Sequence, residues 1–308
     1  MAFYVDAHCH VSTKTTSKGG PMELPSLPVQ RCLMSNNGYD WGRIKELKFS
    51  NSGNKVGFGI HPWYSHMYYI DDQTNRLSKE THYKSVLHSS NVYDLNRVIE
   101  QLPEPVSLTR YIAEEFDRST CDCIGEIGLD KLFRLPENGF YQGDKSAPLG
   151  RVKVKIEHQV KVFEQMCQLA VAHSLPVSVH CVKCPSLMYE LCMKLLSPHR
   201  EINVCLHSFT GSLETLAGMW LKNFPNERLF FSLSRYINFK NHESASKLLQ
   251  VLPLECILTE TDFTWDTVSG ELILRELDFL LSQIAHNYAM DSPEQAKQMV
   301  FKNFQRFI

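Results

Sequence analysis

The stretch RVKVKIEHQVKVFEQMCQLAVAHSLPVSVH (151–180) decides the fold class. Five of its residues fall on one stripe at a spacing near 3.6, namely Val154, His158, Val162, Met166 and Leu169. This period predicts an amphipathic helix over 151–174. The β-rich run PVSVH (176–180) follows at once and predicts a strand. A helix that leads directly into a strand is typical of α/β folds with a parallel sheet.

The same alternation extends over the rest of the chain. Eight short β-rich runs predict strands at 3–7, 31–35, 55–60, 122–127, 176–180, 202–207, 229–233 and 256–260. Helical periods lie between them at 39–48, 91–116 in two pieces, 151–174, 185–196, 212–222, 243–251 and 270–288, before a last helix near 292–306. Eight strands alternating with helices predict an α/β (β/α)8 TIM barrel that forms a single domain over 1–308.

Two segments exceed what a minimal barrel needs. Residues 11–30 are polar and contain Gly and Pro, and residues 64–120 are longer than one crossover requires. We expect them to be insertions after the first and third strands, on the barrel face where active sites form. Each could be a lid, a specificity element or a plain surface insertion, and each could contact a protein partner.

Composition narrows the class of protein. The 308 residues include 32 basic and 34 acidic side chains, so bulk positive charge does not hold this chain to nucleic acid or membrane. No signal peptide and no run of about 18 apolar residues occurs. We expect no membrane association and an intracellular protein in the cytoplasm, with the nucleus open as a second compartment. Several of the ten cysteines fall in apolar runs, which favours reduced thiols over a disulfide framework.

Seven side chains of metal-ligand type lie at or just past the ends of predicted strands: His8, His10, His61, Glu126, His180, His207 and Asp262. His8 and His10 share one face of their strand because side chains alternate. Each residue alone could serve as a turn, a helix cap or a buried histidine bonded to backbone. Their coincidence at one barrel mouth favours a joint role, because burying several imidazoles and carboxylates costs several kcal/mol unless they are paired or bind metal.

This mixture of ligands favours a two-metal hydrolase. Imidazole suits Zn²⁺, Mn²⁺ or Fe²⁺, and a carboxylate such as Glu126 can bridge two ions. Two ions can lower the pKa of a water molecule and clamp both oxygens of a displacement at phosphorus. In this interpretation Asp262 orients or deprotonates the water, and His61 donates to a substrate oxygen.

In order along the chain, six motifs resemble those of the TatD family of metal-dependent deoxyribonucleases, which are amidohydrolase-like barrels. The segments are DAHCH (6–10), GIHPW (59–63), CIGEIGLD (123–130), LPVSVH (175–180), LHSFTGS (206–212) and LTETD (258–262). The terminal NFQRFI is also similar to the family's closing Asn-x-x-x-Phe pattern. The likeness therefore covers nearly the whole chain.

The resemblance implies a ligand set and an activity. It implies that one divalent ion is held by His8, His10, Glu126 and Asp262, while Glu126 bridges to a second held by His180 and His207. It places His61 near the scissile phosphate. It further implies hydrolysis of DNA phosphodiester bonds, on single strands or ends, with two divalent ions (Zn, Mn or Mg) as cofactors.

Some residues depart from the family pattern. Cys181, Val182 and Lys183 stand where the family usually has Ser-Arg-Asp, so Lys183 is the candidate substrate contact in place of an arginine. Thr264 stands in place of the proline of ETDxP, and Trp265 follows. Two alternatives stay open: a hydrolase of a small phosphoester, lactone or amide, and a TatD-like scaffold that acts through protein-protein interaction.

Overall fold

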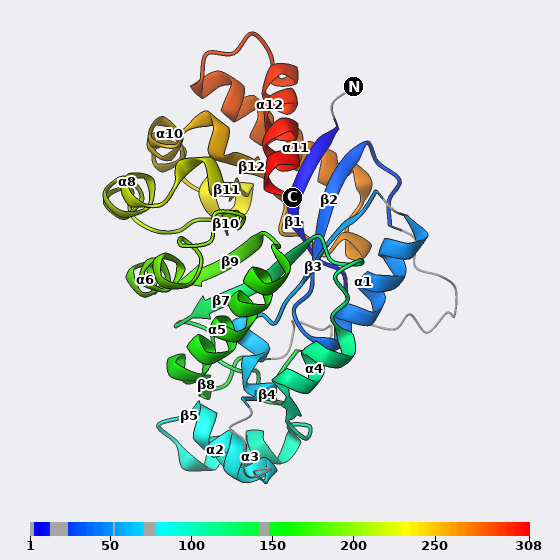
Figure 1. Cartoon of the computed structure of the whole chain (residues 1–308), viewed down its shortest axis with the longest axis vertical. Helices are drawn as coiled ribbons and strands as arrows, with labels where there is room; N and C mark the ends of the chain where they lie inside the picture. The colour runs from blue at the N-terminus through cyan, green and yellow to red at the C-terminus, as the bar shows by residue number, and fades with distance from the viewer. Residues whose placement is uncertain (1–2, 13–23, 52, 71–77, 142–147) are drawn as a thin grey trace.

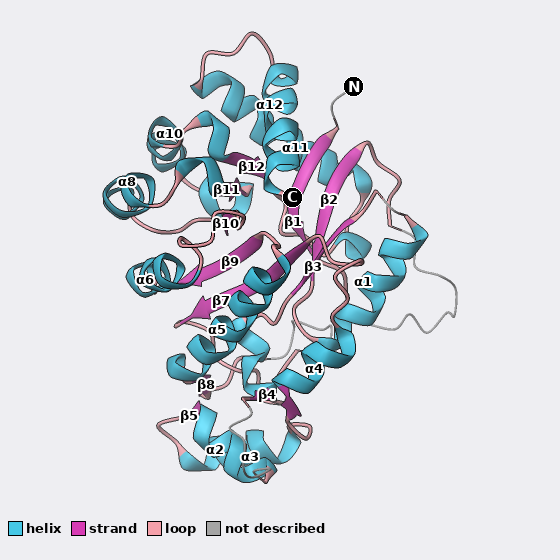
Figure 2. Cartoon of the chain, in the orientation of Figure 1, coloured by secondary structure: helices cyan, strands magenta, loops and turns pink. Residues whose placement is uncertain are grey.

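Eight parallel strands form the centre of the molecule, as the computed structural model shows for residues 3–12, 24–51, 53–70, 78–141 and 148–308 (Figure 1). Their order in the sheet is β1 (Tyr4–Cys9), β2 (Val29–Met34), β3 (Lys55–Phe58), β7 (Cys123–Asp130), β9 (Val177–Val182), β10 (Val204–His207), β11 (Leu229–Leu233) and β12 (Ile257–Thr259). The helices lie outside these strands (Figure 2). The predicted α/β barrel and its eight strands are confirmed.

The helices that follow the strands correspond to the predicted periods, except that α9 (Arg235–Asn238) was not predicted. They are α1 (Gly38–Ser50), α5 (Ile156–His173), α6 (Pro185–Leu195), α7 (Leu213–Thr215), α8 (Leu221–Asn223), α9 (Arg235–Asn238), α10 (His242–Val251), α11 (Gly270–Asn287) and α12 (Pro293–Phe307). Between α7 and α8 the chain takes one π-helical turn, η2 (Leu216–Trp220). Among the described residues, none of the helices is long and apolar enough to span a bilayer.

The strands consist largely of apolar residues because both of their faces are buried by other parts of the protein. In β11 all five residues are buried, and the same is true of all eight residues of β7. One face of each strand packs inside the barrel and the other packs against the helices, as expected for parallel strands. The ten cysteines carry free thiols, and nine of them are buried.

Hydrogen bonds just past the strand ends close the barrel between β12 and β1. The amide of Asp262 donates to the carbonyl of His8 over 3.0 Å, and the amide of His10 donates to the carbonyl of Phe263 over 2.8 Å. The buried Asp6 carboxylate accepts from the amide of Thr261 at 2.8 Å and from the indole of Trp265 at 2.7 Å. The closure therefore fixes the backbone of three candidate metal ligands.

The C-terminal helix α12 seals the opposite side of β12. The side-chain amide of Asn303 donates to the carbonyls of Leu254 and Ile257, each over 2.9 Å. Phe307 is buried, and its ring centroid lies 5.5 Å from that of Phe230. The terminal motif NFQRFI thus has a structural role, because it satisfies carbonyls that lead into β12.

The segment between β3 and β7 folds into a lobe beside the barrel. Its elements are η1 (Pro62–Met67), β4 (Tyr68–Tyr69), α2 (Lys79–Val86), β5 (Leu87–His88), α3 (Val92–Gln101), β6 (Val106–Ser107) and α4 (Leu108–Glu115). In Figure 1, α2 and α3 lie at the end of the molecule farthest from α12. The other predicted insertion, 11–30, lies largely outside the described residues.

The lobe accounts for one wrong boundary. The helix predicted from 151 begins only at Ile156, because Lys153–Val154 form strand β8, which pairs antiparallel with β5. The Nζ of Lys155 donates to the carbonyl of Ser85 over 2.8 Å. Lys155, at the start of this helix, thus joins the lobe to the barrel.

Three buried histidines lie where the lobe packs against α5, and one of them, His158, joins the two. His158 Nε2 lies 2.9 Å from the carbonyl of Ser65, and His82 Nε2 lies 2.8 Å from the carbonyl of His66. Burial lowers the pKa of His158 to about 4 and that of His66 to about 3. These imidazoles are neutral in the folded protein at pH 7.

We predict that His158 makes the fold sensitive to acid. Its pKa is about 4 when folded and 6.5 in an unfolded chain, so its contribution is complete above pH 6.5 and is lost as pH falls toward 4. Between pH 7 and pH 5 the loss from this one histidine amounts to about 2 kcal/mol. Urea unfolding at both pH values should therefore show a smaller pH difference for His158→Gln than for the wild type. The exposed His242→Gln is the matched control, and an equal pH difference in all three proteins would contradict the prediction.

Candidate metal centre

Glu126 lies at the centre of the candidate site because β7 is irregular at this point. The register between β7 and β9 shifts between Ile124 and Ile127, and the amide of Glu126 donates to the carbonyl of Ser35 over 3.1 Å instead of joining the β7–β9 ladder. The side chain is nearly fully buried. The irregular strand thus directs one carboxylate into the barrel mouth.

The strand β7 also runs three residues beyond its predicted end at 127. It passes through Gly128, whose φ of +156° suits glycine, and a Cβ there would lie 1.9 Å from the carbonyl oxygen of His180. Only glycine allows so close an approach of the two strands. The extension brings Asp130 beside His180, with 3.4 Å between Oδ2 and Nε2.

Three imidazoles face one oxygen of Glu126. Oε1 lies 2.8 Å from Nδ1 of His180, 2.8 Å from Nε2 of His207 and 3.3 Å from Nε2 of His61. His180 and His207 end or nearly end β9 and β10, while His61 immediately precedes η1.

Two further imidazoles face the other oxygen. Oε2 of Glu126 lies 3.2 Å from Nε2 of His8 and 3.4 Å from Nε2 of His10. Asp262 adds a second carboxylate on this side, with its Oδ1 3.3 Å from Nε2 of His10. Its side chain is 39% exposed, far more than the other members, so Asp262 faces the open side of the cluster. The structure therefore brings all seven of the predicted residues together.

The cluster fits divalent metal ions. Three groups of side chains bring ligand atoms within 4.8 Å of one another: His8, His10 and Asp262; His8, Glu126 and His207; His61, Glu126 and His180. The buried Nε2 of His8 makes no hydrogen bond among the described residues, although it lies 3.2 Å from Oε2 of Glu126. Buried polar atoms are normally paired, so a lone pair in such a place is suited to a cation.

Acceptors outside the cluster influence which ring nitrogen of an imidazole can bind an ion. Nδ1 of His10 lies 3.0 Å from the carbonyl of Met34, and Nδ1 of His207 lies 3.4 Å from Oε1 of Glu260. An acceptor at one ring nitrogen draws the proton there and leaves a lone pair on the other. In His10 that lone pair lies on Nε2, which faces Glu126. The pKa of His207 is raised by Glu126 and Glu260, so its Nε2 becomes available only when an ion displaces the proton there. In His180, Nε2 faces Asp130 and Nδ1 faces Glu126, so Nδ1 becomes available to an ion once the proton that it shares with Glu126 is displaced.

His61 has the opposite arrangement. The amide of Trp63 donates to its Nδ1 over 3.1 Å, so the ring proton of the neutral imidazole lies on Nε2. Burial lowers the pKa of His61 to about 4, which keeps the ring neutral. Its Nε2 therefore presents a donor to the cluster rather than a lone pair.

The charges in the cluster depend on one another. Burial disfavours the charged form of Glu126, but the surrounding imidazoles outweigh burial and hold the pKa of this carboxyl well below its usual range. Burial also opposes protonation of His180, yet hydrogen bonds to Asp130 and Glu126 raise its pKa to about 9. Since metal ligands must be deprotonated, an ion that binds here displaces protons.

Sequence reasoning missed the residues that hold these ligands. Asp130, Glu260 and Ser178 all lie inside quoted motifs. The position of Asp130 and Glu260 at strand ends was a usable signal, whereas nothing about Ser178 indicated that it lies 3.2 Å from Nδ1 of His8. Lys183, the predicted substrate contact, is not in the cluster. It is exposed and follows β9, with a φ of +58°.

The fold and this cluster define a metal-dependent hydrolase built on a TIM barrel. The chain belongs to the TatD related DNase family, whose model matches residues 5–308. It is 43% identical to an uncharacterized deoxyribonuclease of Saccharomyces cerevisiae over 99% of this chain and 98% of that protein. It is 30% identical to the Cut9-interacting protein of Schizosaccharomyces pombe over 91% of this chain and 92% of the relative.

Solved structures agree with the fold. The TatD homolog of Escherichia coli superposes with a TM-score of 0.60 at 15% identity, covering 99% of this chain and 97% of the other. At this identity the likeness supports the barrel architecture alone.

We predict that Asp130→Asn weakens metal binding about 10- to 100-fold, because it exchanges the acceptor beside Nε2 of His180 for an amide. Competition with a chromogenic chelator measures the affinity for Zn²⁺ or Mn²⁺. The exposed Asp291→Asn is the control. An unchanged affinity in Asp130→Asn would show that Asp130 does not orient His180.

Proposed function

We propose that this protein is a deoxyribonuclease that hydrolyses phosphodiester bonds of DNA, on single strands or ends, with two divalent ions. The observation that carries the proposal is the single buried carboxylate of Glu126, whose two oxygens face two different sets of imidazoles. Such a carboxylate is suited to bridge two ions. The names of its relatives, among them a deoxyribonuclease, support DNA as the substrate.

Each ligand has a proposed role. His8, His10 and Asp262 would hold one ion, His180 and His207 would hold the other, and Glu126 would contribute to both. When bound, such ions activate water and neutralise charge on a phosphate. The ligand atoms are imidazole nitrogens and carboxylate oxygens, which suit Zn²⁺ or Mn²⁺. The carboxylates would also allow Mg²⁺ to bind.

Asp262 is the proposed proton acceptor. Among the clustered residues it has the most exposed side chain, and its pKa lies well below the usual range because His10 and other nearby imidazoles outweigh the effect of burial. The carboxylate is therefore ionised at neutral pH and accessible to a water molecule that attacks phosphorus.

His61 is the proposed donor to the substrate. Its neutral imidazole carries the proton on Nε2, because Nδ1 accepts from the amide of Trp63. A neutral N–H in a water-poor site stabilises charge that develops on a phosphate oxygen. Lys183, at the end of β9, supplies a point charge for the substrate backbone in place of the family's arginine.

A second candidate role is protein binding through the lobe. Val92 and Tyr93 of α3 are largely exposed, at 68% and 73%, and one relative is named for an interaction with another protein. In this alternative the lobe is the contact surface and the cluster need not turn over substrate.

We predict that Glu126→Gln reduces metal-dependent cleavage of DNA by more than about a hundred-fold, which exceeds the effect of losing an outer partner of a ligand. The assay is hydrolysis of end-labelled single-stranded DNA with Mn²⁺ or Zn²⁺, with and without chelator. The exposed Glu243→Gln is the control. Cleavage that survives Glu126→Gln would contradict the proposed centre, and a wild type without cleavage would contradict DNA as the substrate.

A further inference from the structure

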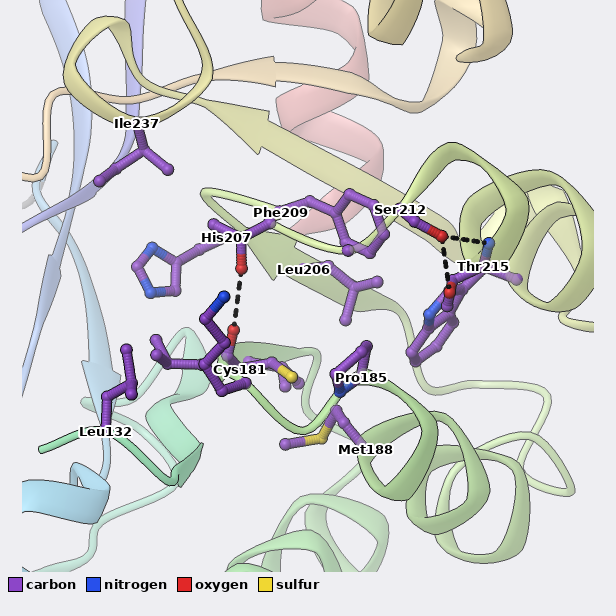
Figure 3. A pocket seen from close by; sticks show the side chains of 16 residues that line it. Leu132, Cys181, Pro185, Met188, Leu206, His207, Phe209, Ser212, Thr215 and Ile237 are labelled. Atoms are coloured by element: carbon purple, nitrogen blue, oxygen red, sulfur yellow. Dashed lines mark hydrogen bonds between the residues drawn. The ribbon is translucent and has the colours of Figure 1, made fainter. Parts of the chain in front are cut away.

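A cavity of about 580 Å³ opens beside the candidate metal centre. It lies between the ends of β9 and β10 and the starts of α6 and α7, and His207 forms part of its wall (Figure 3). His207, Leu132 and Ile237 lie toward one end of it, and Ser212 and Thr215 lie toward the other (Figure 3). Its volume falls within the range of small-molecule sites, about 300–1,000 Å³.

The cavity touches the metal cluster directly. His207 lines it and also places Nε2 2.8 Å from Glu126. A substrate whose phosphate lies at the cluster can therefore extend its neighbouring group into the cavity. Leu132 and Ile237 stand exposed near His207, at 55% and 39%, and present apolar surface to such a group.

The walls do not suit a second phosphate. Among the described residues that line the cavity, Lys183 is the one Lys, Arg, Asp or Glu. The rest is largely apolar, with contributions from Val179, Met188, Leu206 and Phe209. A polyanion needs several cations or amide donors, whereas this surface favours a flat or apolar group.

Trp220 lines the cavity and carries a buried indole N–H that has no acceptor among the described residues. The residue is 1% exposed. The indole N–H can only donate. Leaving a buried donor unpaired costs about 1–3 kcal/mol, which a ligand acceptor at this position would recover.

Trp220 ends the π-helical turn η2. Such turns are rare, and they occur frequently at functional sites because the extra residue redirects a side chain. Tyr189 contacts the indole edge-on, with 5.3 Å between ring centroids, and so helps to fix its orientation. The local backbone and the unpaired donor are thus two separate observations at the same wall.

We propose that this cavity is a binding site for one unpaired nucleobase of the substrate, with the indole N–H of Trp220 donating to a carbonyl or ring nitrogen of the base. The proposal rests on the proposed nuclease function. Each natural base is flat and carries such acceptors, and its size suits a cavity that adjoins the cluster. A base held in a duplex is stacked and paired, so the site selects unpaired strands or frayed ends.

A binding experiment on the wild-type protein tests this directly. The chain has four tryptophans, whose indole N–H signals can be followed by ¹⁵N-edited NMR, and Trp220→Phe assigns the signal of Trp220. Millimolar thymidine or deoxyadenosine should shift that signal saturably, because a new acceptor meets the N–H. The base-free 2-deoxyribose 5-phosphate should not. The indole of Trp41, bonded to the carbonyl of Glu115 at 3.0 Å, is the internal control.

A kinetic ratio gives a second readout. The substrates are a short single-stranded oligonucleotide and the same oligonucleotide with an abasic unit at the cleaved end. Trp220→Phe keeps the aromatic body and removes the donor, so it should lower the ratio of kcat/KM for the two substrates about three- to ten-fold. Trp41→Phe, which removes an indole outside the cavity, should leave the ratio unchanged.

The outcomes separate the two proposals. Cleavage of both oligonucleotides at equal rates, without a nucleoside-dependent shift of the Trp220 signal, overturns the base site and leaves the nuclease intact. Cleavage of neither oligonucleotide, with a shift on adding nucleoside, supports the base site and contradicts the nuclease. If Trp220→Phe does not fold, replacing the other three tryptophans assigns the signals and the wild-type titration still decides.

Discussion

The site depends on one constraint, which is that the charge of Glu126 must be compensated inside a barrel. A buried carboxylate loses its hydration and persists as an anion only when donors or cations surround it. Here five imidazoles from four parts of the barrel meet its two oxygens. The irregular register of β7 that turns this side chain inward is therefore the local feature on which the rest of the cluster depends.

A second layer of contacts gives each imidazole its chemical role. Asp130 and the carbonyl of Met34 face the outer ring nitrogens of two imidazoles and so leave the inner nitrogens to an ion, whereas the amide of Trp63 donates to Nδ1 of His61 and leaves the ring proton on Nε2. The same residue type thus serves as metal ligand and as hydrogen-bond donor. The closure by Asp6 and Trp265 supports this layer, because it fixes the backbone around His8, His10 and Asp262.

Much of the fold could be predicted because its strands are buried on both faces and its helices are amphipathic. The strand ends could also be predicted to collect His8, His180 and His207. Three features could not. The extension of β7 through Gly128 depends on close contact with His180, the pairing of β5 with β8 involves only two residues per strand, and the π-helical turn before Trp220 has no sequence period of its own. Each arises from tertiary contacts rather than local pattern.

Metal content of purified variants tests the account most directly. By elemental analysis, the wild type should hold about two divalent ions per chain. His207→Ala should hold about one, because it removes a ligand, and His61→Ala should still hold about two, because the ring nitrogen that it removes from the cluster carries a proton. Loss of an ion from His61→Ala equal to that from His207→Ala would contradict the division of roles among the histidines.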